Sequence, residues 1–135
     1  MARRLRTQNG FKNWLAKSTL LPLTSATQGI LNRRTLSKLP ADAYLINAAR
    51  GEHLVEEDLI AALESGHLSG ACLDVFREEP LPESHPFWSH PQVTVTPHVA
   101  SLTYPRDVAP QIVANYHRVR AGQLPWNVVD LKRGY

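Results

Sequence analysis

The sequence contains a single cysteine, Cys72, in 135 residues, and this excludes an internal disulfide framework. A lone thiol is typical of proteins in a reducing compartment such as the cytoplasm. No apolar run approaches the length of a membrane span, and the sequence shows no secretory signal peptide with its hydrophobic central region. The seven glycines are scattered, and none begins the G-x-G-x-x-G pattern of a phosphate-binding loop. The remaining composition, 43% hydrophobic and 20% charged, favours one soluble globular domain.

Positive charge is concentrated at the start of the sequence. Residues 1–17 carry five Lys and Arg and no acid, whereas the rest of the chain carries ten basic and twelve acidic residues. Such a leader could contact nucleic acid or an anionic membrane, or direct targeting, but a frayed terminus without a dedicated role is the simpler interpretation. We therefore expect no membrane partner and disfavour nucleic acid. The predicted division is a basic leader at 1–18, a folded unit at 19–121 and a tail at 122–135.

From residue 19 onward, short apolar runs alternate with helical patterns. The runs predict strands at 19–23, 43–47, 70–76 and 93–96. Asn32 predicts the N-cap of a short helix, and the acids at 56–58 predict the start of another helix that ends at Gly66. A last helix is expected over 105–121, with Pro110 kinking it or shifting its start. This alternation predicts an α/β fold in which crossover helices connect the strands of a parallel sheet.

Polar side chains follow three of the predicted strands. Arg50, Asp74 and His98 stand at or just past the carboxyl ends, where ligands bind in parallel sheets. The planar fork of Arg50 suits a carboxylate and its charge would polarise a carbonyl, although a surface arginine beside a loop is the ordinary alternative. The imidazole of His98 could give and take a proton near neutral pH, or could simply bond a backbone carbonyl.

Two carboxylates accompany these groups. Glu79 could pair with His98 and favour the imidazolium form, although taken alone it is one of several solvated acids. Asp74 ends a buried strand, where an uncompensated carboxylate is costly, so it needs partners. Those partners are either the amides of a loop or the amide of a cofactor.

Other reactive side chains are interpreted as structural. His85, His90 and His98 with Glu79 match no compact metal-ligand spacing, so we predict no metal site. Cys72 lies within a predicted strand, and we interpret it as a small core residue rather than a nucleophile.

Four motifs, in order, resemble those of the D-isomer-specific 2-hydroxyacid dehydrogenases. They are Leu21-Pro22-Leu23-Thr24, Asn47-Ala48-Ala49-Arg50-Gly51, Asp74-Val75-Phe76 with Glu79-Pro80, and Thr96-Pro97-His98-Val99-Ala100. Pro86-Phe87-Trp88 and the final Arg133-Gly134-Tyr135 are similar to the glyoxylate/hydroxypyruvate reductase branch. Family members are much longer, with a separate substrate domain and a first βαβ unit that carries the phosphate loop. The resemblance therefore implies a partial Rossmann-type parallel sheet that lacks both, with residues 19–121 as the carboxyl half of an NAD(P)-binding domain.

The resemblance also implies a chemistry, the NAD(P)H-dependent reduction of a small 2-oxo acid such as glyoxylate or hydroxypyruvate. Arg50 would anchor the substrate carboxylate and oxygen. His98 would protonate the developing alkoxide, with Glu79 holding the imidazole in its charged form. The cofactor would be NADPH or NADH, with NADPH slightly favoured. The residues implied at the cofactor are Pro22, Leu23, Ala48, Arg50, Asp74 and His98.

Two other functions remain open at this point. One is a non-catalytic remnant or association module, because an unpaired strand at 19–23 would leave an open apolar sheet edge that pairs with other chains. For the same reason we expect a homo-oligomer or pairing through that edge. The other is a binding module that uses the basic leader and merely reuses the fold.

Overall fold

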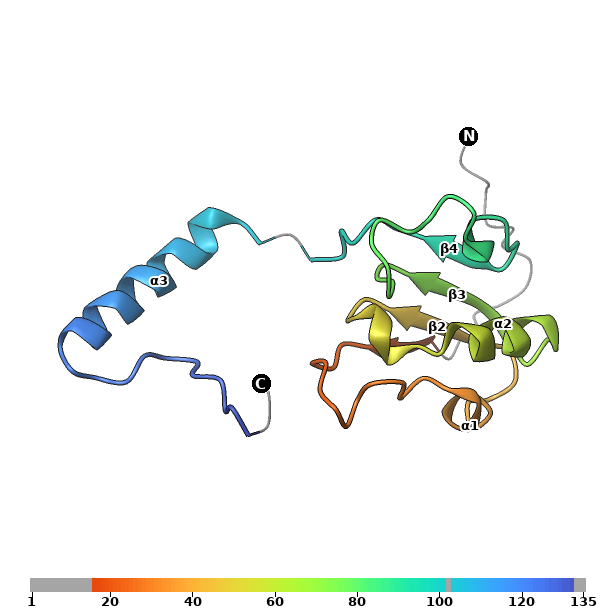
Figure 1. The fold of residues 1–135 in the computed structure, drawn as a ribbon, viewed down its shortest axis with the longest axis horizontal. Helices are drawn as coiled ribbons and strands as arrows, with labels where there is room; N and C mark the ends of the chain where they lie inside the picture. Colours follow the sequence, from red (N-terminus) through yellow and green to blue (C-terminus); the bar gives the residue numbers. More distant parts are fainter. Residues whose placement is uncertain (1–15, 102, 133–135) are drawn as a thin grey trace.

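The computed structural model describes residues 16–101 and 103–132. Four parallel strands form one sheet in the order β1-β2-β3-β4, which confirms the predicted α/β class (Figure 1). The strands are β1 (Ala16–Thr19), β2 (Ala43–Asn47), β3 (Leu68–Leu73) and β4 (Val93–Val95). The helices are α1 (Arg33–Leu36), α2 (Glu56–Glu64) and α3 (Pro105–Arg120), with 3-10 turns η1 (Gly51–His53) and η2 (Pro86–Trp88).

The first strand lies earlier in the chain than the sequence predicts. The prediction of a strand at 19–23 is wrong, because β1 ends at Thr19, which pairs with Asn47 at the end of β2. Beyond this point β2 offers no further partner, and Pro22 has no N–H to donate to a ladder. Residues 20–23 therefore leave the sheet as a loop. Among the described residues β1 pairs with β2 alone, so it remains an edge strand as expected, with Lys17 and Ser18 exposed.

The other three strand predictions err at most at their ends, and β4 stops at Val95 rather than at Thr96. β2 has the predicted bounds, whereas β3 begins two residues before the predicted Gly70 and ends at Leu73 rather than at Phe76. Its early end has a physical reason, because Asn47 is the last residue of β2 and Leu73 is its partner. Asp74 consequently lies just outside the sheet, at its carboxyl edge.

The helix predictions hold with small changes. The side chain of Asn32 accepts hydrogen bonds from the N–H groups of Arg34 and Thr35, so it caps α1 as predicted. α2 begins at Glu56 and ends just before Gly66, whose φ of 73° is the left-handed conformation that glycine adopts without penalty. α3 runs through Pro110 without a break, so this proline does not shift the helix start.

One hydrophobic core joins the sheet to α1 and α2. Along β2, Ala43, Leu45 and Asn47 are buried, while the residues between them are half-buried. Leu59 and Leu63 of α2 pack into the same core. Each fully buried leucine contributes about 1.5–3 kcal/mol relative to an exposed one, so this face holds the strand ends in place.

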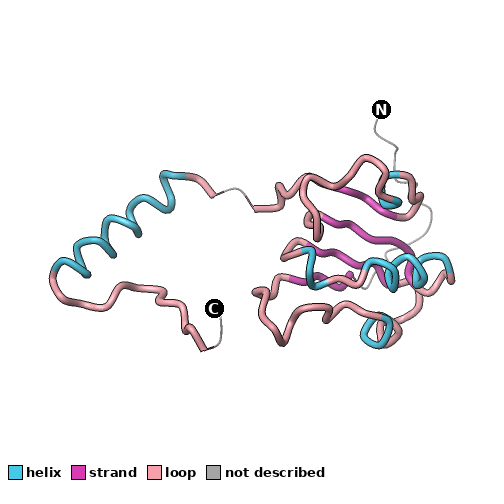
Figure 2. The backbone as a smooth tube through the Cα atoms, viewed as in Figure 1, coloured by secondary structure: helices cyan, strands magenta, loops and turns pink. Residues whose placement is uncertain are grey.

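The last helix stands apart from the sheet. None of the residues of α3 is buried, and Figure 2 shows the helix away from the four strands. Its contacts are with the chain that follows it. The N–H of Trp126 donates to Oδ1 of Asn115 at 2.7 Å, and Nε of Arg118 donates to the carbonyl of Leu124 at 2.8 Å. Residues 105–126 therefore form a helix–tail unit.

Some of the sequence predictions concern residues that the structure does not describe. The basic leader falls on residues 1–15 for most of its length, and the terminal Arg133-Gly134-Tyr135 also lies outside the described residues. None of the helices in the described part of the chain has the length and apolar content that a bilayer crossing requires.

Candidate active site

A histidine–carboxylate pair lies just past the carboxyl ends of β3 and β4. Nδ1 of His98 is 2.8 Å from Oε2 of Glu79, which confirms the predicted pairing. The other oxygen of Glu79 accepts the N–H of Phe76 at 2.9 Å. The hydrogen bond with His98, reinforced by the one from Phe76, lowers the pKa of the Glu79 carboxyl below its usual range. Because an ionised carboxylate only accepts, Nδ1 carries the proton of this bond and Nε2 faces away from Glu79.

The backbone around His98 fixes where the ring points. His98 has φ 53°, a left-handed conformation that costs a non-glycine residue about 1–2 kcal/mol. Its N–H donates to the carbonyl of Asp74 at 2.9 Å, which helps to hold this conformation. The imidazole remains half exposed beside a pocket of about 440 Å³ with mainly apolar walls. The pocket residues are Phe76, Glu79, Pro80, Leu81, Trp88, Val95, Pro97 and His98.

Asp74 holds the loop that carries His98. Its Oδ1 accepts from the hydroxyl of Thr96 and from the N–H of Val99 at 3.0 Å, and its Oδ2 accepts from the N–H of Ala100 at 2.9 Å. Burial by itself raises the pKa of this carboxyl, but the three hydrogen bonds and the nearby His98 outweigh it, so the pKa is lower than usual. The sequence left two possible partners for Asp74, the amides of a loop or the amide of a cofactor. The structure shows that loop groups are its partners. Its role at a cofactor stays a prediction.

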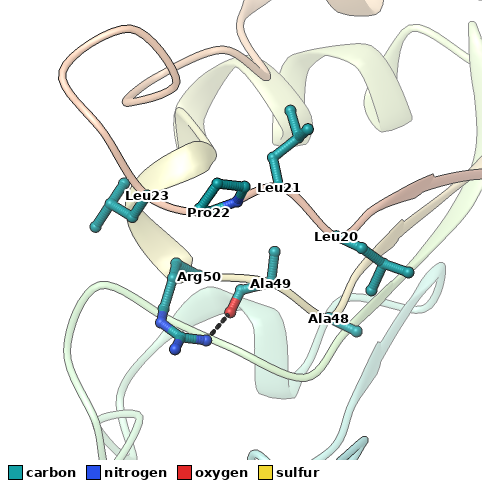
Figure 3. A pocket seen from close by; sticks show the side chains of 7 residues that line it. All are labelled: Leu20, Leu21, Pro22, Leu23, Ala48, Ala49 and Arg50. Carbon is teal, nitrogen blue, oxygen red and sulfur yellow. Dashed lines mark hydrogen bonds between the residues drawn. The ribbon is translucent and has the colours of Figure 1, made fainter. Parts of the chain in front are cut away.

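The other predicted site residues line a cleft of about 500 Å³ at the same edge of the sheet (Figure 3). One side is the exposed loop Leu20–Leu23, and the other is the turn Ala48–Arg50 that follows β2. Nη1 of Arg50 donates to the carbonyl of Ala49 at 2.6 Å. This bond uses one of the five N–H donors of the guanidinium, and the exposed side chain keeps others for a ligand.

Asn47 links the two halves of the site and has no role in the sequence-based prediction. Its side chain is fully buried, accepts the N–H of Ala49 at 3.2 Å and donates to the carbonyl of Arg50 at 3.0 Å. Its carbonyl accepts the N–H of Asp74 at 3.0 Å. The signal was present in the sequence, because an asparagine that ends a buried strand needs partners for the same reason as Asp74 does.

Gly51 brings the Arg50 turn against the segment that leads to Glu79. A Cβ on Gly51 would lie 1.9 Å from the carbonyl carbon of Phe76 and 2.4 Å from the nitrogen of Arg77. Only glycine allows backbone to approach backbone this closely. The arginine turn and the start of the Glu79 loop are therefore packed directly on each other.

Cys72 has the properties of a structural residue. Burial, with a smaller contribution from the charge of Asp74, raises the pKa of the Cys72 thiol. A raised pKa lowers the thiolate fraction and with it the nucleophilicity. His85 pairs with Glu56 of α2 at 3.3 Å rather than with Glu79.

A parallel sheet with an arginine and a histidine–carboxylate pair beyond its strand ends defines a class, the nucleotide-dependent oxidoreductase domain. The comparisons with known proteins give the family. The chain belongs to the D-isomer-specific 2-hydroxyacid dehydrogenases, since residues 11–100 match the model of that family's NAD-binding domain. Its members are NAD(P)-dependent oxidoreductases.

Named relatives are similar to most of this chain. A glyoxylate/hydroxypyruvate reductase A of Yersinia enterocolitica is 55% identical over 116 residues, which are 86% of this chain and 37% of that protein. The corresponding protein of Serratia proteamaculans is 56% identical over the same shares. The chain thus spans little more than a third of the length of the curated relatives it matches.

Solved structures show the same backbone with a cofactor present. A D-isomer-specific 2-hydroxyacid dehydrogenase of Xanthobacter autotrophicus, in complex with NADPH, superposes with a TM-score of 0.86 at 50% identity, covering 89% of this chain and 50% of that one. An NADPH-dependent glyoxylate/hydroxypyruvate reductase of Sinorhizobium meliloti, in complex with NADP, superposes at 0.83 with 40% identity, covering 89% and 40%.

The residues of the cleft fit the nicotinamide end of such a cofactor. Leu21, Pro22, Leu23 and Ala48 line the cleft, whose exposed surface is more polar than apolar, and the turn ends in the charged Arg50. The sequence holds no Gly-rich loop for the pyrophosphate.

Proposed function

We propose that residues 19–121 form the carboxyl half of the catalytic centre of an NAD(P)H-dependent reductase of small 2-oxo acids, glyoxylate or hydroxypyruvate. The observation that carries the proposal is the 2.8 Å bond between His98 and Glu79, at the same sheet edge as the cleft that contains Arg50. A proton donor and a carboxylate anchor at one edge are what reduction of a 2-oxo acid requires from side chains. The names and cofactors of the relatives support this assignment.

Arg50 binds the acid end of the substrate in this proposal. Its guanidinium can form two parallel hydrogen bonds to a carboxylate, and its permanent charge draws electrons toward the 2-oxo oxygen. The bonds of Asn47 to the Arg50 turn, and the packing of Gly51 on Phe76, fix the backbone from which the side chain reaches out.

His98 donates the proton to the oxygen of the former carbonyl. Glu79 accepts from Nδ1, which orients the ring and leaves Nε2 as the nitrogen that faces a substrate. A bound NADPH or NADH supplies the hydride that the carbonyl carbon receives. Pro22 and Leu23 would line the cofactor cleft, the Ala48 backbone would approach the nicotinamide, and Asp74 would bind near its amide. NADPH is the favoured cofactor because the related structures hold NADPH or NADP.

The test is turnover by the purified chain. Loss of the nicotinamide absorbance is followed with NADPH, then NADH, in the presence of glyoxylate or hydroxypyruvate. His98→Ala should lower kcat by about 10²–10⁴-fold. His117→Ala, an exposed histidine of α3, is the matched control and should leave kcat unchanged. Equal rates in the two variants would contradict the proposal. A folded wild-type chain without turnover would show that this half does not assemble a working site by itself, which favours a remnant or a subunit that needs its other half.

A second candidate is an association module with an open sheet edge. It is favoured by β1, which among the described residues pairs with β2 alone, and by the exposed apolar Leu20 and Leu21 beside it. A dimer or larger homo-oligomer in light scattering, with no cofactor binding, would support this function. We place the protein in the cytoplasm on the basis of its single cysteine, and expect a homo-oligomer in either case.

A further inference from the structure

A buried histidine lies between the two sides of the cofactor cleft. His53 of η1 has no exposed surface, and its Nε2 is 3.3 Å from the carbonyl oxygen of Pro22. Within residues 16–101 and 103–132, its Nδ1 has no hydrogen-bond partner and is itself buried. Because a carbonyl only accepts, Nε2 carries the proton of this contact.

Such a ring is an expensive way to fill a core. A buried polar atom without a partner costs free energy that a leucine or methionine of similar volume avoids. The hydrogen bond to Pro22 is the interaction that an apolar side chain at position 53 could not make. The cost of burying the imidazole therefore indicates a role for this hydrogen bond.

The same short turn anchors the other side of the cleft. The N–H of His53 donates to the carbonyl of Arg50 at 3.3 Å, and the carbonyl of His53 accepts the N–H of Leu31 at 2.8 Å. The backbone of η1 therefore holds the Arg50 turn and the far end of the loop that begins at Leu20. The imidazole of His53 holds the near end of that loop at Pro22.

The near end has little else to fix it. Leu20, Leu21 and Leu23 are 74%, 45% and 37% exposed, so packing contributes little there. The Pro22 carbonyl also accepts the hydroxyl of Thr27 at 2.8 Å, but Thr27 belongs to the same loop and moves with it. In the described part of the chain, the bond from His53 is the side-chain hydrogen bond that ties Pro22 to η1.

We propose that His53 is a positioning residue for the cofactor cleft. Its Nε2–H holds the Pro22 side of the cleft at a fixed separation from the Arg50 side, so that a flat ring can enter without ordering the loop first. The apparent affinity for a ligand is proportional to the fraction of molecules whose loop is in the binding-competent position. Holding the loop in that position therefore raises the apparent affinity. The inference rests on the proposed function for the identity of the ligand, whereas the tie itself is a property of the ligand-free protein.

Three variants test the role of the bond. His53→Met fills the volume without a donor, and His53→Gln keeps an N–H donor at the reach of Nε2. His67→Met is the matched control, because Nε2 of His67 bonds the carbonyl of Leu36 at 3.2 Å away from the cleft. Hydrogen exchange is followed at the amides of Thr24 and Gln28, which are bonded within the loop. The dissociation constant of NADPH is measured on the same proteins.

His53→Met should exchange these amides about three- to tenfold faster and weaken NADPH binding by a similar factor, the range that one hydrogen bond supports. His53→Gln should recover most of both, and His67→Met should leave both unchanged. Equal behaviour of His53→Met and wild type would overturn the role of His53. Failure of His53→Gln to restore the exchange rates and the NADPH affinity would also overturn it. The same holds if His67→Met has an effect as large as that of His53→Met. A wild-type chain that does not bind NADPH would overturn the proposed function, while the exchange data would still decide the tie.

Discussion

The N–H of Asp74 donates to the carbonyl of Asn47 at 3.0 Å, which joins the residue that ends β2 to the residue that follows β3. One side of this link leads to Arg50 and the other to the loop that carries His98. The arginine and the histidine are therefore positioned by one polar network at the sheet edge rather than by two independent loops. Perturbing either member of the link should affect both halves of the site.

Asn47→Ala should lower the free energy of unfolding by about 1–3 kcal/mol. The substitution removes the bonds to Ala49 and Arg50, so the N–H of Ala49 loses this acceptor and the carbonyl of Arg50 keeps only the N–H of His53. Native-state hydrogen exchange of the β2 and β3 amides measures this loss. Gln28→Ala, at an exposed loop position, should stay within about 0.5 kcal/mol of wild type. A loss at Asn47 no larger than at Gln28 would show that the network carries no free energy.

Asp74→Asn should flatten the acid side of the stability profile. Asp74 and Glu79 both have lowered pKa values in the folded protein, so the unfolded chain binds protons at a higher pH than the folded chain does. Their contribution is complete above the unfolded value of about 4 and is lost as the pH falls through the folded values. Wild type should therefore lose stability below about pH 4.

The measurement is urea unfolding at a series of pH values. Asp74→Asn should be less stable than wild type at neutral pH, because its amide replaces a charged acceptor of three hydrogen bonds. Its stability should then fall less steeply as acid is added. Parallel curves for the two proteins would show that Asp74 is not a source of the acid dependence.

Gly51→Ala should be among the most damaging single substitutions in the sheet unit. The new Cβ would meet the carbonyl carbon of Phe76 at 1.9 Å, and both partners are backbone, so the segments must separate. We expect a loss of about 3 kcal/mol or more in unfolding free energy, together with weaker NADPH binding. Gly66→Ala is the informative control. Its Cβ meets nothing within 4 Å, so only the φ of 73° opposes it, at about 1–2 kcal/mol.

Glu79→Gln should lower kcat through His98. It replaces a charge-assisted hydrogen bond by a neutral one, and the difference corresponds to a loss of about ten- to a hundredfold. The double variant with His98→Ala should be no slower than His98→Ala alone, because both changes remove the same function. Steady-state kinetics of the four proteins decide this. Additive losses would assign Glu79 a role separate from His98.

The fold could be predicted from the sequence wherever side-chain pattern and chain geometry agree. β2 and the start of α2 lie where the apolar run 43–47 and the acids 56–58 place them. The first strand could not be located from its apolar residues, because an edge strand with one partner tolerates exposed Lys17 and Ser18 in its middle. The apolar run at 20–23 belongs instead to a cleft wall.

Part of the candidate site could also be predicted from the sequence, and part could not. The pairing of Glu79 with His98 followed from chemistry, since an imidazole and a carboxylate at one sheet edge attract each other. Asn47 and His53 were missed because their partners are backbone carbonyls and amides, which every residue carries and no motif marks. The carboxyl end of β3 was predicted too late in the chain. This end depends on where the neighbouring strand β2 stops, which the residues of β3 do not indicate.

The separation of α3 from the sheet has a consequence for any spectroscopic experiment on this protein. Within the described residues, the sheet unit has one tryptophan, Trp88, whose indole N–H donates to the carbonyl of Pro82. The helix–tail unit has another, Trp126, which lies against the guanidinium of Arg118 at 5.0 Å. Because no residue of α3 is buried, the two units lack the shared core that would make them melt together. Trp88 and Trp126 should therefore report on separate transitions, one of the sheet unit and one of the helix–tail unit.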